Sequence, residues 1–205
     1  MIDMMMNENV IKQKTGLFGI ALLLVWSVSS FTPASDLEKE RRWESQIVDS
    51  LLDGEPVKLK DGVGLEFLAI HTGEALDSDR AVIVVHGIGV HPDWPDVIYP
   101  LRVGLPEAGI PTLSIQMPIL PNEKTSQDYL PLFSEVGGRF DAAVRYLLEA
   151  GHSKISIVAH SMGATMAVDY LSNKVVPEVD SLVIVGMGPG IEGSSVDNLK
   201  ALEKI

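Results

Sequence analysis

The stretch "KISIVAHSMGATM", residues 154–166, decides the fold of this 205-residue chain. Its first half carries Ile155, Ile157 and Val158, and apolar β-branched residues of this kind favour a short buried strand. From Met162 onward the stretch contains good helix formers. Ser161 therefore lies at a turn where a strand is expected to pass directly into a helix, with no loop between them.

The rest of the chain is expected to alternate between strands and helices. The strands are apolar without a polar alternation, and helical stretches separate them, which indicates a parallel sheet covered on both faces. We therefore expect the α/β class: a three-layer α/β/α fold with a mostly parallel sheet, opened by a hairpin across Asp61-Gly62. The expected strands are 55–60, 63–70, 80–87, 111–117 and 181–187 besides the one before Ser161, and the expected helices are 36–52, 96–108, 133–151 and 161–174.

The Ser161 turn has the residue pattern that a nucleophile needs between a strand and a helix. Such a turn has strained backbone angles, at a cost of about 1–3 kcal/mol. It also needs small residues two positions before and after, where Ala159 and Gly163 stand. The geometry exposes the serine hydroxyl and directs the amide of Met162, at the positive end of the helix, toward a developing oxyanion.

A second loop, "HGIGVHPDWP" at residues 86–95, follows a neighbouring strand. Its Gly-x-Gly lets backbone amides face a ligand, so Ile88 or Gly89 is expected to supply the second oxyanion donor. His86 is expected to hydrogen bond beneath this loop. Two interpretations remain for the other possible pocket residues of this loop, which are His91, Asp93 and Trp94. They either line the pocket, or they form a rigid turn in which the Trp94 side chain packs.

The sequence does not supply an evident base for Ser161. The chain has five histidines, and none follows Ser161. His160 is expected to be a packed support residue, because its position next to Ser161 directs its side chain away from the hydroxyl. His91 and Asp93 are two potential ligands, which is too few for a metal site, and the absence of cysteine excludes thiolate ligands. The stretch "GMGPG" at 186–190 lacks the glycine spacing of a dinucleotide-binding loop. We therefore predict neither a metal nor a cofactor.

Together the motifs resemble the α/β-hydrolase superfamily. Its Gly-x-Ser-x-Gly appears at residues 159–163 with alanine in the first place, and its His-Gly-x-Gly appears at 86–89. More narrowly, the two motifs behind an export signal resemble a family of exported bacterial hydrolase-like proteins. The resemblance covers about Pro56 to Gly190. It implies Ser161 as a nucleophile and Met162 with Ile88 or Gly89 as oxyanion donors. The first functional hypothesis is therefore a serine hydrolase that acts on an ester or related small acyl substrate.

The family order places an acid and then a histidine after the nucleophile, on turns that follow later strands. Here one helix follows the strand expected at 181–187, so we expect a C-terminally shortened version of a longer hydrolase, with little esterase activity on its own. The alternative is a catalytically inactive exported binding or interaction protein that lacks the triad acid and histidine.

The pattern of the N-terminal region indicates an export signal. Lys12 and Lys14 precede the apolar stretch 16–28, and a small residue suited to cleavage stands at Ala34. The apolar core is shorter than the ~20 residues of a spanning helix, which favours cleavage over a permanent N-terminal anchor, although the anchored alternative stays open. We therefore expect a signal peptide at 1–34, one domain at 35–205, no stable membrane insertion after cleavage, and a periplasmic or secreted protein.

The net charge of the whole chain is −12. An acidic surface of this size argues against nucleic acid or an anionic membrane as a partner. The oligomeric state stays open.

Overall fold

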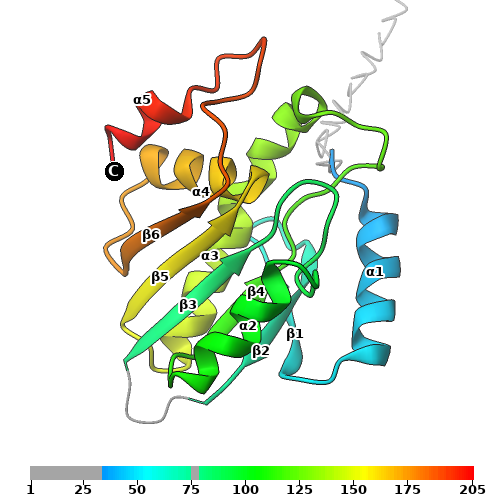
Figure 1. The fold of residues 1–205 in the computed structure, drawn as a ribbon, viewed down its shortest axis with the longest axis vertical. Coiled ribbons are helices and arrows are strands. Elements are labelled where there is room, and N and C mark those ends of the chain that lie inside the picture. Colours follow the sequence, from blue (N-terminus) through cyan, green and yellow to red (C-terminus); the bar gives the residue numbers. More distant parts are fainter. Residues whose placement is uncertain (1–33, 75–78) are drawn as a thin grey trace, which may run out of the picture. The chain divides into compact units, whose positions relative to one another are not determined.

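The computed structural model describes residues 34–74 and 79–205. The expected signal peptide therefore lies outside the described residues, apart from Ala34. Figure 1 shows the order of the elements. Their bounds are α1 (Leu37–Ser50), β1 (Glu55–Lys60), β2 (Glu66–Thr72), β3 (Arg80–Val85), α2 (Ile98–Glu107), β4 (Thr112–Ile115), the 3-10 helix η1 (Ser126–Leu132), α3 (Phe133–Glu149), β5 (Lys154–His160), α4 (Met162–Asn173), β6 (Val179–Val185) and α5 (Asn198–Leu202).

The six strands form one sheet in the order β1-β2-β4-β3-β5-β6. The strands β4, β3, β5 and β6 are parallel, and the antiparallel hairpin of β1 and β2 joins them through β4. Ile83 in β3 lies opposite Leu113 on one side and Ile157 on the other, so three apolar residues lie side by side at the centre of the sheet. The expected α/β class, the mostly parallel sheet and the hairpin are confirmed.

Helices cover both faces of the sheet, which gives the expected three layers (Figure 1). Residues of α3 and α4 pack with Ile83 and Ile157 in the main hydrophobic core. On the other face, α2 packs through Ile98 on Val84 and Val158. Also on that face, α1 packs on Ile70 and its neighbours in β2. Neighbouring residues of a strand thus face different helices, as expected for strands buried on both sides.

A buried ion pair connects α1 to α3. Arg139 is fully buried, and its guanidinium lies 2.9 Å from a carboxylate oxygen of Glu40. Its Nη1 also donates to the carbonyl of Gln116, just after β4. Truncating one partner of such a pair typically costs about 3–5 kcal/mol, because the other charge is left buried and unpaired. This pair fixes the start of the described chain on the sheet.

The strand β6 is an edge of the sheet and has only β5 as a neighbour among the described strands. Val183 at its centre is 49% exposed. An apolar edge strand with free backbone groups is a template for pairing with another chain. In the part of the chain that the structure describes, no helix has the length and apolar character needed to cross a membrane.

Candidate active site

Ser161 occupies the turn between β5 and α4. Its φ is 53° and its ψ is −121°, and it is the only residue other than glycine with a positive φ among the described residues. A serine in this region of backbone space is strained by about 1–3 kcal/mol and persists only where the surrounding structure imposes it. The Ser161 amide donates to the carbonyl of Val185, so β6 holds the turn from one side.

The small residues beside Ser161 allow a close approach between α4 and β3. A Cβ placed on Gly163 would lie 2.2 Å from the carbonyl oxygen of His86 and 2.9 Å from Val85 Cγ1. Ala159 is fully buried in the sheet. Met162 begins α4, and the amides of a first helical turn have no acceptor within the helix. The Met162 amide is thus of the kind that binds an anion.

His86 fixes the peptide between Gly87 and Ile88. The Met117 amide donates to His86 Nε2 over 2.9 Å, so this nitrogen is an acceptor and the proton lies on Nδ1. Nδ1 then donates to the Gly87 carbonyl at 2.8 Å. Because a trans peptide places its N–H opposite its C=O, the Ile88 amide points away from His86. Burial lowers the pKa of His86 to about 3, which keeps the ring neutral.

The amide of Gly89 lies near another buried group, the hydroxyl of Tyr129. Tyr129 is buried beneath the loop; burial raises the pKa of its hydroxyl, and hydrogen bonds from the amides of Leu120 and Gly89 oppose that shift. The Leu120 amide lies 3.1 Å from the hydroxyl oxygen. The sequence reasoning missed Tyr129 because it stands in a segment without helical or strand periodicity. The available signal was Thr125-x-x-Asp128, a capping box that begins η1.

The residues of "HPDWP" form a compact turn. The rings of Trp43 and Trp94 meet the His91 ring edge-on, at centroid distances of 5.2 and 5.5 Å. Burial lowers the pKa of His91. Asp93 pairs with the fully buried Arg102 of α2 at 2.6 Å. This geometry favours the rigid-turn alternative, and Arg102 is a residue that the sequence reasoning did not single out.

His160 is the last residue of β5, and its ring lies next to glycines that follow β3 and β6. A Cβ on Gly87 would lie 3.1 Å from His160 Nδ1, and one on Gly186 would lie 3.9 Å from Nε2. Nδ1 is buried and has no hydrogen-bond partner among the described residues. Nor do those residues include a histidine that hydrogen bonds to the hydroxyl of Ser161. Of the later carboxylates, Asp197 caps α5 and pairs with Lys200.

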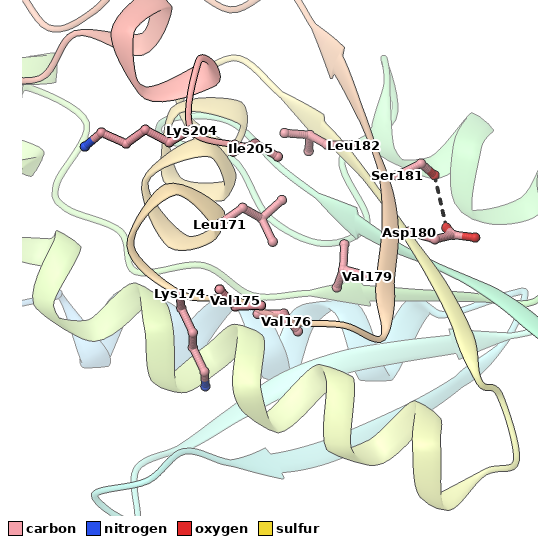
Figure 2. A pocket seen from close by; sticks show the side chains of 10 residues that line it. All are labelled: Leu171, Lys174, Val175, Val176, Val179, Asp180, Ser181, Leu182, Lys204 and Ile205. Carbon is pink, nitrogen blue, oxygen red and sulfur yellow. Dashed lines mark hydrogen bonds between the residues drawn. The ribbon is translucent and has the colours of Figure 1, made fainter.

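A cavity of about 260 Å³ lies away from this site, at the edge of the sheet. Figure 2 shows its lining, which comes from the end of α4, the start of β6 and the chain after α5. Ser161 and the 86–95 loop do not contribute to it. In residues 34–74 and 79–205, no group of three or more potential ligands could hold a metal ion.

The fold is of the α/β-hydrolase type, and solved esterases share it. An esterase of Pyrococcus furiosus has a TM-score of 0.53 and 18% identity, with 69% of this chain and 52% of that chain covered. A cold-adapted esterase from an Arctic intertidal metagenomic library has a TM-score of 0.51 and 20% identity, covering 63% and 58%. An Exiguobacterium antarcticum esterase has a TM-score of 0.50 and 18% identity, covering 66% and 47%. The chain thus spans about half the length of the solved structures it matches.

The family model described as "Protein of unknown function (DUF3530)" matches residues 32–129 and 127–202. These matches cover most of the chain, and the chain belongs to this family. Comparison with curated protein sequences gives no match.

Proposed function

We propose that this chain carries the nucleophile and the oxyanion hole of a serine hydrolase that acts on an ester or related small acyl substrate. The observation that carries the proposal is the backbone of Ser161, with a φ of 53° at a strand-to-helix turn. Such strain clusters at functional sites, where it is part of the mechanism. The solved esterases of the same fold support the part of this proposal that concerns an acyl substrate.

In the proposed reaction Ser161 Oγ attacks the acyl carbonyl carbon, and the carbonyl oxygen becomes an oxyanion. The amides of Met162 and Ile88 donate to that oxyanion. Ile88 is favoured over Gly89 because the Gly87–Ile88 peptide is the one that His86 holds. His86 orients the Ile88 amide by holding the Gly87 carbonyl. His86 is therefore a positioning residue and not a base.

The proton of Ser161 needs an acceptor, and a serine without a base is a weak nucleophile at neutral pH. The described residues bring no histidine into hydrogen bonding with Ser161, so we expect slow acylation of this chain. That same observation favours a second candidate, an exported binding or interaction protein that keeps the Ser161 turn and lacks turnover. The reactivity of Ser161 toward an acylating probe separates the two candidates.

The test is labelling by a fluorophosphonate probe, followed by mass spectrometry, with and without added imidazole as an external base. We expect labelling of the wild type that imidazole accelerates, and no labelling of Ser161→Ala. The matched control is Ser172→Ala, near the end of the helix α4 that follows Ser161, which should react like the wild type. No adduct on folded wild-type protein in either condition would instead support the binding protein.

A further inference from the structure

The first described residues are fixed to the start of α3 through one carboxylate. The amide of Ala34 donates to Glu135 Oε1, and the Ser35 hydroxyl donates to Oε2 at 2.7 Å. The Ser35 nitrogen lies 3.2 Å from Oε1. One residue later, the Asp36 amide donates to the carbonyl of Ile119 at 2.8 Å. The chain at Ser35 is therefore held at a defined place on the domain.

Glu135 is buried, with 4% of its surface exposed, and the partners it has are neutral donors. It belongs to no ion pair in the described part of the chain. Arg139, one turn further along α3, pairs with Glu40. Burial raises the pKa of Glu40, and the charge of Glu135 contributes in the same direction. The two buried carboxylates thus have one cationic partner between them, the guanidinium of Arg139, because the buried ammonium of Lys39 donates to the Leu120 carbonyl and to Asn122 instead. A buried charge without a counter-charge is costly.

We propose that Ser35 is the N-terminus of the mature protein and that its α-ammonium group is the missing counter-charge of Glu135. A leader peptidase of the export machinery hydrolyses the bond between Ala34 and Ser35. Water adds across this peptide bond, so Ala34 leaves with a carboxylate and Ser35 gains an ammonium group. This group has three donors where the peptide had one, and it replaces both the Ala34 and the Ser35 amide at Glu135.

The order of events follows from burial. Ser35 is 8% exposed in the folded domain whereas Ala34 is exposed, so folding covers the Ser35 side of the bond and we expect cleavage before the domain folds. Folding then places the new ammonium group against Glu135, and the buried ion pair stabilises the processed form. The inference concerns maturation and does not depend on the chemistry proposed for Ser161.

The first test is the N-terminus of the exported protein. The full 205-residue chain is expressed in a bacterial host with an intact export system, and the product is analysed by intact mass and N-terminal sequencing. The expected first residue is Ser35. A product that begins at Met1, or at any residue other than Ser35, overturns the proposal.

The second test measures the reactivity of the Ser35 amine toward an amine-acylating reagent at about pH 6.5, well below the pKa of an ordinary α-amino group, read by mass spectrometry. An ion pair that raises the pKa of an α-amino group by one unit lowers its reactive fraction about tenfold. We expect acylation at least about tenfold slower in the wild type than in Glu135→Gln. Glu149→Gln, which changes an exposed carboxylate of the same helix, should react like the wild type.

A comparison within the wild type does not require the variant to fold. Acylation of the Ser35 amine should accelerate about tenfold when the protein is unfolded in urea, because unfolding breaks the ion pair. Equal rates in folded and unfolded protein, or in wild type and a folded Glu135→Gln variant, would overturn the pairing.

Discussion

Acid should destabilise the protein through His86. The ring is fully buried, and burial lowers its pKa from 6.5 to about 3. Unfolding returns the ring to water, where it takes up a proton below pH 6.5. The folded pKa is the lower one, so the contribution of the neutral ring is present above pH 6.5 and is lost as the pH falls toward 3.

The magnitude follows from the two pKa values. Each pKa unit corresponds to about 1.4 kcal/mol, so His86 alone removes about 2 kcal/mol of unfolding free energy between pH 7 and pH 5, and about 3 kcal/mol by pH 4. Other groups titrate in the same range, so the measurement is a difference. Urea unfolding of the wild type and of His86→Asn is followed from pH 7 to pH 4, because the variant lacks the titrating ring.

We expect the stability advantage of the wild type over His86→Asn to shrink by about 2 kcal/mol on going from pH 7 to pH 5. A difference that stays constant across this range would refute the reasoning. If the variant does not fold, NMR titration of the wild type gives the same information. The His86 ring signals should not shift until close to pH 3, and a midpoint near 6.5 would contradict the burial argument.

The remaining predictions concern the turn, the loop and the edge strand. Gly163→Ala should cost several kcal/mol by urea unfolding, because its Cβ would meet the backbone at 2.2 Å, whereas Gly137→Ala, with open space in α3, should stabilise by about 0.5–1 kcal/mol. His86→Asn keeps a hydrogen-bond donor near the Gly87 carbonyl, and His86→Gln does not. Fluorophosphonate labelling of Ser161 should therefore be faster in His86→Asn than in His86→Gln, and equal rates would argue against a positioning role of His86. Val183→Lys should reduce aggregation measured by light scattering more than Val175→Lys, because only Val183 lies on the open edge strand.

The sequence predicts the elements of the fold well because local patterns determine them. Apolar runs such as 80–85 and 154–159 are long enough to be strands buried on both faces, and helical stretches separate them. The turn at Ser161 follows from local composition too, since only small residues allow the close approach seen at Gly163. The position of β4 between β2 and β3 depends on long-range packing and has no local signal.

The interactions that stabilise the candidate site are less predictable for the same reason. The pairs of Arg102 with Asp93 and of Arg139 with Glu40 join residues from different elements, and nothing near an arginine in the sequence identifies its partner. Tyr129 and Gly89 likewise come from different segments of the chain. The positions of individual amides, and hence the choice between Ile88 and Gly89, become accessible only when these contacts are known.

The most direct test of the account is a crystal structure of the fluorophosphonate adduct. We expect a covalent bond from phosphorus to Ser161 Oγ, with a phosphonyl oxygen about 3 Å from the amide nitrogens of Met162 and Ile88. An adduct on another residue, or a phosphonyl oxygen that faces away from both amides, would contradict it.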